Sequence, residues 1–438
     1  MRILIVDRGA YALDWALRCV ADGHKVKWFR KNDERTWNIG RGMVDIVDDW
    51  RDWARWADLI FLPDNTLYLY EVDNWRRTFG TPVIGPTLAS AALELDRDAG
   101  MKLLKRHGVA VPPFRTFTRY DDAIAFVKRE GRRFVSKPCG DEPDKSLSYV
   151  SKSAADMVYM LERWKKAQRH KGAFIMQEFV GGTEMAVGGW FGPGGFQDGW
   201  CENWEFKKLM PGDLGVATGE QGTVLRQVDS SLLADKVLAP LEEELHRLGH
   251  TGYVDVNCII DDEGTPWPLE WTMRPGWPLF NIQQALIEGD HAEWLGALAD
   301  GSASKPWLKN KPAVGVVLSI PDYPYSKFTR KSVTGIPIYG LTSRNLPHIH
   351  PCEIMLGEAP MDVDGKVVHG PCWVTAGDYV LVASGVGDSV TSARNKVYRT
   401  LKQIEIPNSP MYRTDIGNRL SKQLPLIQPQ GYAEGLTF

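Results

Sequence analysis

The sequence predicts an α/β protein that begins with a doubly wound parallel sheet and continues into two further units. Three observations lead to this fold class. Strand-like and helix-like segments alternate over about 90 residues at the N-terminus. A Val-Pro-Pro run at 111–113 marks a crossover into a second unit, and a polar Lys/Pro stretch at 304–312 precedes a third.

The N-terminal unit opens on residues 1–7, a short apolar run of the kind that a buried parallel strand needs. The elements expected after it are helices at 11–22 and 50–57 and strands at 24–29, 58–63 and 82–85. The turn after the first strand contains one glycine, Gly9, and therefore lacks a dinucleotide-binding fingerprint. A nicotinamide-dependent enzyme is disfavoured for this reason.

The second unit combines a lysine at the end of one strand with an acidic residue after the next. The expected elements are helices at 86–110 and 154–168 and strands at 132–138 and 173–179. Lys137 can meet a phosphate as a point charge, backbone groups at 177–180 can bond an adenine edge, and Glu184 can accept ribose hydroxyls. These positions predict a nucleotide slot, with a solvated surface lysine as the structural alternative.

A glycine-rich stretch follows at 205–223, with glycines at positions 212, 215, 219 and 222. Such spacing lets backbone N–H groups approach a bound anion, and Lys207, Lys208 and Asp213 lie beside them. A flexible surface loop is the structural alternative.

Residues 253–276 read as two strands joined by a tight Asp-Asp-Glu-Gly turn, after a helix expected at 230–250. Oxygen-bearing side chains lie two residues apart in each strand and so share a face: Asp255 and Asn257, then Glu270 and Thr272, with Arg274 two residues further on. This pattern can hold Mg²⁺ and a polyphosphate together. An ordinary hairpin with one buried glutamate is the structural alternative.

The C-terminal unit should be rich in strands. Strands are expected at 313–320, 353–356, 366–369 and 379–383, followed by a helix at 389–403. From residue 423 the chain is rich in Pro, Gln and Gly and is expected to be extended or poorly ordered.

Composition excludes several classes of protein. The net charge of −3 gives no basic footprint, so strong non-specific nucleic-acid binding is not expected. The six cysteines are scattered, which is typical of reduced thiols in a cytoplasmic protein. No apolar run approaches the length of a membrane span, and no signal peptide is recognisable.

The order of these features resembles the ATP-grasp ligases and, within them, the phosphoribosylamine–glycine ligase family. The resemblance covers residue 1 to about residue 420 and is carried by VIGPT (83–87), RHGVAVP (106–112), QEFVGGTE (177–184), KKLMPGDLGVATGEQG (207–222) and GTPWPLEWTMRPG (264–276). Its most specific match is VASGVGDSVTSARNKVY (382–398) followed by MYRTDIGNRL (411–420). No shared chemistry requires that ending, so it argues for common descent.

The resemblance implies a domain plan: an N-terminal α/β substrate domain at 1–90, an ATP-grasp α+β domain at 91–305 with a lid at 114–182, a β-rich domain at 306–422 and a tail at 423–438. It implies ATP contacts from Arg97, Lys137, Lys145, Glu178, Phe179, Val180 and Glu184. Ligands of Mg²⁺ or Mn²⁺ would be Glu270, Thr272 and Asn257. Catalytic roles fall to Arg274, Asp213 and Lys207, and substrate contacts to Gly9, Asp64, Asp213, Gly215, Thr218, Gly219 and Arg274.

The implied reaction has two steps and belongs to purine biosynthesis in the family. ATP phosphorylates a carboxylate to an acyl-phosphate, and an amine then attacks it to give an amide, ADP and phosphate. The family default joins glycine to phosphoribosylamine in a cytoplasmic monomer or homodimer without membrane partners.

Five departures from the family pattern bear on this default. Residues 8–11 replace the family's Arg-Glu-His turn after the first strand, and the ATP flap keeps Lys145 but not the glycines beside it. Thr272 occupies the position of a family asparagine, Trp277 that of an acidic residue and Arg97 that of a lysine. A diverged ligase with another amine acceptor, such as a modified nucleotide or nucleobase, is therefore the first alternative. A nucleotide-binding pseudoenzyme is the second.

Overall fold

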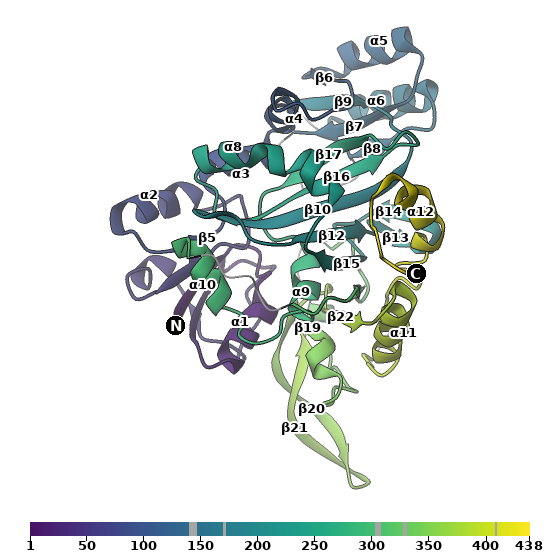
Figure 1. The fold of residues 1–438 in the computed structure, drawn as a ribbon. Coiled ribbons are helices and arrows are strands. Elements are labelled where there is room, and N and C mark those ends of the chain that lie inside the picture. Colours follow the sequence, from purple (N-terminus) through teal and green to yellow (C-terminus); the bar gives the residue numbers. More distant parts are fainter. Residues whose placement is uncertain (140–146, 170–171, 303–307, 327–330, 408–409) are drawn as a thin grey trace.

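The fold was analysed in a computed structural model that describes residues 1–139, 147–169, 172–302, 308–326, 331–407 and 410–438. The N-terminal domain is a five-stranded parallel sheet in the order β3-β2-β1-β4-β5 (Figure 1). Its elements are β1 (Arg2–Asp7), α1 (Leu13–Ala21), β2 (Lys25–Arg30), β3 (Ile46–Val47), β4 (Leu59–Phe61), α2 (Leu69–Phe79) and β5 (Val83–Ile84). The predicted doubly wound sheet is confirmed, but the helix expected at 50–57 is only a short 3₁₀ turn, Trp50–Asp52.

The strand order reverses between β1 and β4. The chain runs outward from β1 to β3 on one side and then returns to β4 on the other. Ligands of open α/β sheets bind outside the carboxyl ends of the strands at such a reversal. The loops that follow β1 and β4 carry Gly9 and Asp64, two of the predicted substrate residues.

The helix expected at 86–110 is two helices, α3 (Leu88–Leu95) and α4 (Arg97–Arg106). Asp96 separates them, because its extended backbone ends α3 and its carboxylate caps α4 by accepting from the N–H groups of Asp98 and Ala99. The break places Arg97 at the first turn of a new helix.

The segment predicted to be a lid contains a separate four-stranded sheet, β6-β9-β7-β8, at one end of the molecule (Figure 1). Its elements are β6 (Phe114–Phe117), α5 (Tyr120–Glu130), β7 (Phe134–Pro138), β8 (Tyr149–Val150), α6 (Ala154–Ala167) and β9 (Phe174–Glu178). The two helices pack on the sheet through a core that includes Val127, Phe134, Leu161 and Phe174.

The centre of the molecule is an antiparallel sheet in the order β17-β16-β10-β12-β15-β18-β22-β19, with β11 beside β10. The strands are β10 (Thr183–Gly192), β11 (Gly195–Phe196), β12 (Trp200–Glu205), β15 (Gly222–Val228), β16 (Gly252–Ile260), β17 (Pro266–Thr272), β18 (Ala313–Leu318), β19 (Ile349–Pro351) and β22 (Leu381–Val386). Strands from beyond residue 306 therefore continue the sheet that begins at β17. The predicted domain limits stay a prediction.

Shorter elements border this sheet. They are β13 (Lys208–Met210), β14 (Leu214–Ala217), α7 (Leu232–Val237), α8 (Glu242–Arg247), α9 (Leu279–Gln284), α10 (Glu293–Asp300) and α11 (Val390–Leu401). None of the helices in the described part of the chain combines the length and apolar character that crossing a membrane requires. All six cysteines are free.

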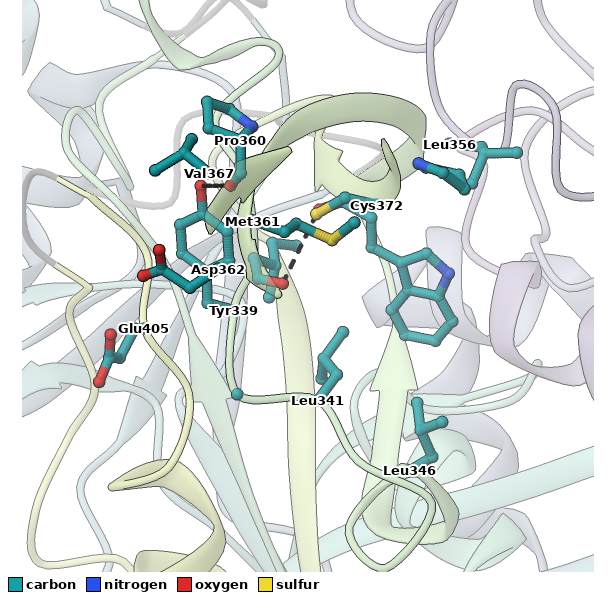
Figure 2. A pocket seen from close by; sticks show the side chains of 14 residues that line it. Tyr339, Leu341, Leu346, Leu356, Pro360, Met361, Asp362, Val367, Cys372 and Glu405 are labelled. Carbon is teal, nitrogen blue, oxygen red and sulfur yellow. Dashed lines mark hydrogen bonds between the residues drawn. The ribbon is translucent and has the colours of Figure 1, made fainter. Parts of the chain in front are cut away.

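The hairpin of β20 (Ile354–Val363) and β21 (Lys366–Thr375) projects from the end opposite the lid (Figure 1). Along this hairpin lies an open cavity of about 880 Å³, lined by apolar side chains such as Leu341, Met361 and Trp373 (Figure 2). None of the predicted site residues lines it.

The C-terminal segment is folded. Leu420–Ile427 form α12 despite Pro425, and Tyr432 and Leu436 are buried. The hydroxyl of Tyr432 donates to the carbonyl of Gly264 at 2.7 Å. The expectation of an extended or poorly ordered tail is wrong, because tertiary contacts order a stretch that composition marks as weak.

Candidate functional site

The predicted polar face of the 253–276 hairpin is present. Asn257 on β16 lies directly across from Glu270 on β17, and Asp255 lies across from Thr272. Partners on paired strands project on the same side of a sheet, so the four polar side chains share one face. Ala186 of β10 is the neighbour of Asn257 on the other side.

Lys207 lies at the centre of a group of carboxylates. Its Nζ is 2.9 Å from Oε1 of Glu270, 2.8 Å from Oε2 of Glu205 and 3.5 Å from Oε1 of Glu184. Asn257 Nδ2 donates to Glu184 at 2.8 Å and to Glu205 at 2.7 Å. Burial works to lower the pKa of Lys207, but the three carboxylates outweigh it and hold that pKa well above its ordinary value.

Glu270 is held between two cations. Lys207 contacts Oε1, and Nη1 of Arg97 contacts Oε2 at 3.0 Å. The Lys207 charge is the main reason that the pKa of Glu270 lies well below its ordinary value, with Arg97 and Lys137 adding to it against the effect of burial. The Glu270 carboxylate is therefore ionised across the physiological range.

Lys137 brings a third cation from the lid. It lies at the end of β7, and its Nζ donates to the carbonyl of Leu269 at 2.9 Å, one residue before Glu270. Burial lowers the pKa of Lys137 to about 8, and the nearby Glu270 carboxylate opposes that shift. An anion such as a phosphate would raise this pKa again and stabilise the charged form further.

Gln177 is a lid residue whose side chain the sequence did not single out. Val135 pairs with Gln177 and Lys137 pairs with Ile175, so Gln177 projects on the same side of the lid sheet as Lys137. Its side chain is buried, yet neither its Nε2 nor its Oε1 has a hydrogen-bond partner. Unpaired buried amides are costly, which suits a residue that meets a ligand's polar edge.

The predicted adenine hinge already uses part of its hydrogen-bonding capacity within the protein. The N–H of Glu178 donates to Pro113 O at 2.8 Å and that of Phe179 to Arg133 O at 3.4 Å. The Glu178 carboxylate pairs with Arg132 at 2.9 Å on the surface. Val180 follows the end of β9. Lys145, in the predicted ATP flap, lies outside the described residues.

The glycine-rich stretch forms the two-stranded β13–β14 hairpin. Asp213, at its turn, has a left-handed backbone (φ 56°) and pairs with Nη2 of Arg413 at 2.8 Å. Gly215 is also left-handed (φ 79°), and Thr218 donates through both its N–H and its hydroxyl to Lys207 O. Thr218 therefore links the loop to the backbone of Lys207. At Gly219, an added Cβ would meet no atom within 4 Å.

Arg274 and the turn after β1 form a second region. Nη2 of Arg274 is 3.2 Å from Oε1 of Glu94. Asp64 accepts from the N–H and the hydroxyl of Thr66 at 2.7 and 2.8 Å, and Thr66 in turn accepts from Nη1 of Arg8 at 2.6 Å. The ring of Tyr11 covers Gly9, where an added Cβ would lie 2.1 Å from the ring.

The chemistry of the Glu270 face fits a divalent cation. The Oδ1 of Asn257 is buried without a partner, faces the same side as the ionised Glu270, and is an oxygen of the kind that Mg²⁺ prefers. Within the described ranges no three His, Cys, Asp or Glu side chains converge as a complete metal cage. Mg²⁺ in nucleotide enzymes is typically held by one or two protein oxygens and the phosphates, so an incomplete set is the expected form.

Sequence reasoning missed several members of the site. Glu205 and Arg419 are among them: Arg419 Nη2 is 3.8 Å from Glu184, and its Nη1 is 3.7 Å from Asp213. Arg419 lies in the MYRTDIGNRL stretch, whose conspicuous match to the family was a usable signal. Glu205 lies only two residues before Lys207, but nothing in the sequence shows that Asn257 of β16 donates to its carboxylate.

Comparison with known proteins identifies relatives along most of the chain, although no family model matches. A phosphoribosylamine–glycine ligase of Ralstonia nicotianae is 26% identical over 357 residues, covering 78% of this chain and 80% of the relative. One from Neisseria meningitidis serogroup B is 24% identical over 455 residues, covering 96% and 99%.

The fold points the same way. The crystal structure of phosphoribosylamine–glycine ligase from Thermotoga maritima superposes with a TM-score of 0.70 at 20% identity, covering 95% of this chain and all of the other. The chain is thus similar in sequence to phosphoribosylamine–glycine ligases along most of its length, and it shares their fold.

Proposed function

We propose that the protein is an ATP-dependent carboxylate–amine ligase that forms an amide through an acyl-phosphate. The observation that carries the proposal is the ionised Glu270, held between Arg97 and Lys207 beside Lys137 and facing the unpaired Asn257 oxygen. The three cations suit the phosphates of a nucleotide, and the carboxylate with the Asn257 oxygen would suit a divalent cation.

In the first step a carboxylate oxygen of the amino-acid substrate attacks the γ-phosphorus of ATP, and ADP leaves. Arg97, Lys137 and Lys207 contact the phosphates and offset the charge that develops on the transferred group. Glu270, with Asn257 and the Thr272 hydroxyl, would hold Mg²⁺ or Mn²⁺, which when bound would supply Lewis-acid stabilisation of phosphate charge. Glu184 accepts the ribose hydroxyls, and the segment at 178–180 borders the adenine.

In the second step an amine nitrogen attacks the acyl carbon, the carbon–oxygen bond to phosphate breaks, and the amine loses a proton. Arg274 binds the departing phosphate or the acyl group, with Glu94 fixing its guanidinium. The lid sheet excludes water, which would otherwise hydrolyse the acyl-phosphate.

The relatives' names suggest glycine and phosphoribosylamine as the substrates. In this assignment the loop with Asp213, Gly215, Thr218 and Gly219 holds the amino acid, and the turn with Gly9 and Asp64 holds the amine. A ligase that uses another amine is the second candidate, favoured by the aromatic side chains of Tyr11 and Trp277 at that turn.

Mg²⁺-dependent ADP release tests the proposal. Purified protein is given ATP, Mg²⁺ and a panel of amino acids crossed with amines, including glycine with phosphoribosylamine. ADP formed only when both substrates are present, together with an amide product, is the expected result. ATP binding without ADP release for any pair would contradict the proposal and favour a nucleotide-binding pseudoenzyme.

A further inference from the structure

The turn after β1 contains a carboxylate where a phosphate would otherwise bind. Asp7 ends β1, and its Oδ1 accepts from the N–H of Gly9 at 3.1 Å. Its Oδ2 accepts from the N–H of Ala12 at 2.8 Å and from Nε1 of Trp28 at 3.2 Å. The side chain of Asp7 is fully buried.

These N–H groups lie at the entry to α1, beside the reversal of strand order between β1 and β4. Free N–H groups at such a turn, with the dipole of the following helix, are the usual means of binding a phosphate in an α/β sheet. Asp7 engages them internally, and its own negative charge repels a second anion. The turn is therefore unsuited to a phosphate.

An aromatic surface stands beside the same turn. Tyr11 stacks on Trp277 with ring centroids 5.7 Å apart and planes inclined by 23°. Trp277 is anchored through Nε1, which donates to Pro63 O in the loop after β4 at 3.3 Å. Tyr11 keeps 37% of its surface exposed, with Trp277 stacked on its ring and Gly9 against its Cε2 and Cζ atoms.

Charged groups surround the Tyr11 ring. Arg35, Asp64 and Arg274 are close enough to act on its hydroxyl electrostatically, as is Asp7. Arg35 pairs with Glu353 at 3.9 Å, and Asp64 is bonded to Thr66. The Tyr11 ring can stack on a planar amine, and the charged groups near it can bond polar atoms at the edge of that ligand. A flexible aliphatic amine would gain less from this surface.

We propose that the amine acceptor is an amine on a planar, heteroaromatic or aromatic ring, which stacks on Tyr11 and places no phosphate at the turn after β1. This inference rests on the proposed ligase function and narrows its acceptor. The ring amine provides the nitrogen that forms the new C–N bond, phosphate leaves from the acyl carbon, and the proton passes to solvent.

The binding arm of the test uses isothermal titration calorimetry with ribose 5-phosphate, an unreactive phosphorylated sugar, and with adenine and aniline as ring amines. The wild-type protein should bind at least one ring amine and give no saturable heat with ribose 5-phosphate. Asp7→Gly frees the turn and should gain ribose 5-phosphate binding. Asp7→Asn keeps the side-chain shape without the charge and serves where Asp7→Gly unfolds.

The kinetic arm uses the ring amine with the highest ADP release. Tyr11→Leu and Trp277→Leu should each raise its KM about tenfold and leave the KM for ATP unchanged, since a lost ring contact costs about that factor. Tyr11→Phe keeps the ring and should behave as wild type. Tyr70→Leu, which removes a 65% exposed tyrosine from the same domain, is the matched control.

The experiments distinguish failure of this inference from failure of the proposed ligase function. Saturable binding of ribose 5-phosphate to the wild type, or efficient turnover of phosphoribosylamine that Tyr11→Leu does not affect, would overturn the inference while leaving the ligase function intact. Absence of ADP release with every amine, with ATP binding preserved, would instead reject the proposed function.

Discussion

The nucleotide side and the acceptor side of the site differ in how they treat negative charge. On the nucleotide side Arg97, Lys137 and Lys207 surround Glu270. On the acceptor side Asp7 takes up the N–H groups of the turn, and Tyr11 covers Gly9. If the proposed assignment holds, the cations around Glu270 serve to activate a carboxylate, and the turn with Asp7 and Tyr11 selects the amine. The two tasks would then be able to diverge independently, because different segments of the chain carry them.

Glu270→Gln should have the largest effect and tests the nucleotide side directly. A neutral amide cannot offset the charge of a divalent cation, and it also releases the charge contacts with Arg97 and Lys207. ADP release should fall on the order of 10²–10³-fold. The measurement is steady-state ADP release at saturating Mg²⁺, with Glu358→Gln on the projecting hairpin as the exposed control. Unchanged turnover in Glu270→Gln would show that the 253–276 hairpin has only a structural role.

Asp7→Asn should change the pH dependence of stability and tests the acceptor side. Burial raises the pKa of Asp7 to about 6 from its ordinary 3.8. A raised carboxyl pKa means that the folded state binds the proton more tightly, so stability is full below pH 4 and is lost as pH rises through 6. Two pKa units correspond to about 3 kcal/mol.

The Asn variant lacks this titration, so its free energy of unfolding relative to wild type should rise by about 3 kcal/mol between pH 4 and pH 7. Urea unfolding at both pH values measures this difference. An unchanged difference between the two pH values would mean that Asp7 is solvated and does not fill the turn.

Much of the fold was predictable, because its strands are apolar runs with local periodicity. The run at β1 and the 253–276 hairpin follow from spacing alone, and the shared face of Asn257 and Glu270 follows from the two-residue repeat of strands. The break at Asp96 was missed, since an apolar stripe continues across it and only the capping geometry reveals it. The helix at Leu420–Ile427 was missed because its order comes from tertiary contacts.

The site was predictable only where a residue type was conspicuous in its strand or loop. Lys207 and Glu270 could be named singly, but nothing local shows that they touch at 2.9 Å. Asp7 looked like the ordinary polar end of a strand. Its role depends on the turn folding back so that the N–H of Ala12, five residues later, reaches its carboxylate. Such partners are set by tertiary structure, which no short pattern encodes.

Asn257→Ala and Thr272→Ala should have smaller effects and sharpen the nucleotide side. Loss of the unpaired Asn257 oxygen should weaken Mn²⁺ binding in the presence of ADP about tenfold, a typical consequence of removing one metal contact. Thr272→Ala should do less, because a hydroxyl is a weaker ligand than an amide oxygen. Electron paramagnetic resonance of free Mn²⁺ measures both. A larger loss in Thr272→Ala would reverse the assignment of the second ligand.

Arg132→Ala should have the smallest effect. It tests whether the Glu178 side chain contributes to ATP binding. Arg132 pairs with Glu178 at 2.9 Å, but its side chain is 54% exposed, so the pair contributes less than about 1 kcal/mol to stability. If the hinge contacts adenine through its backbone, freeing the Glu178 carboxylate should leave the KM for ATP within about twofold of wild type, since an exposed charge contributes little. Steady-state kinetics with varied ATP measures this, with Lys128→Ala as a second exposed lid cation for control. A much larger rise in KM would place the Glu178 side chain itself against the base, and would extend the charged nucleotide side of the site to the outer edge of the lid.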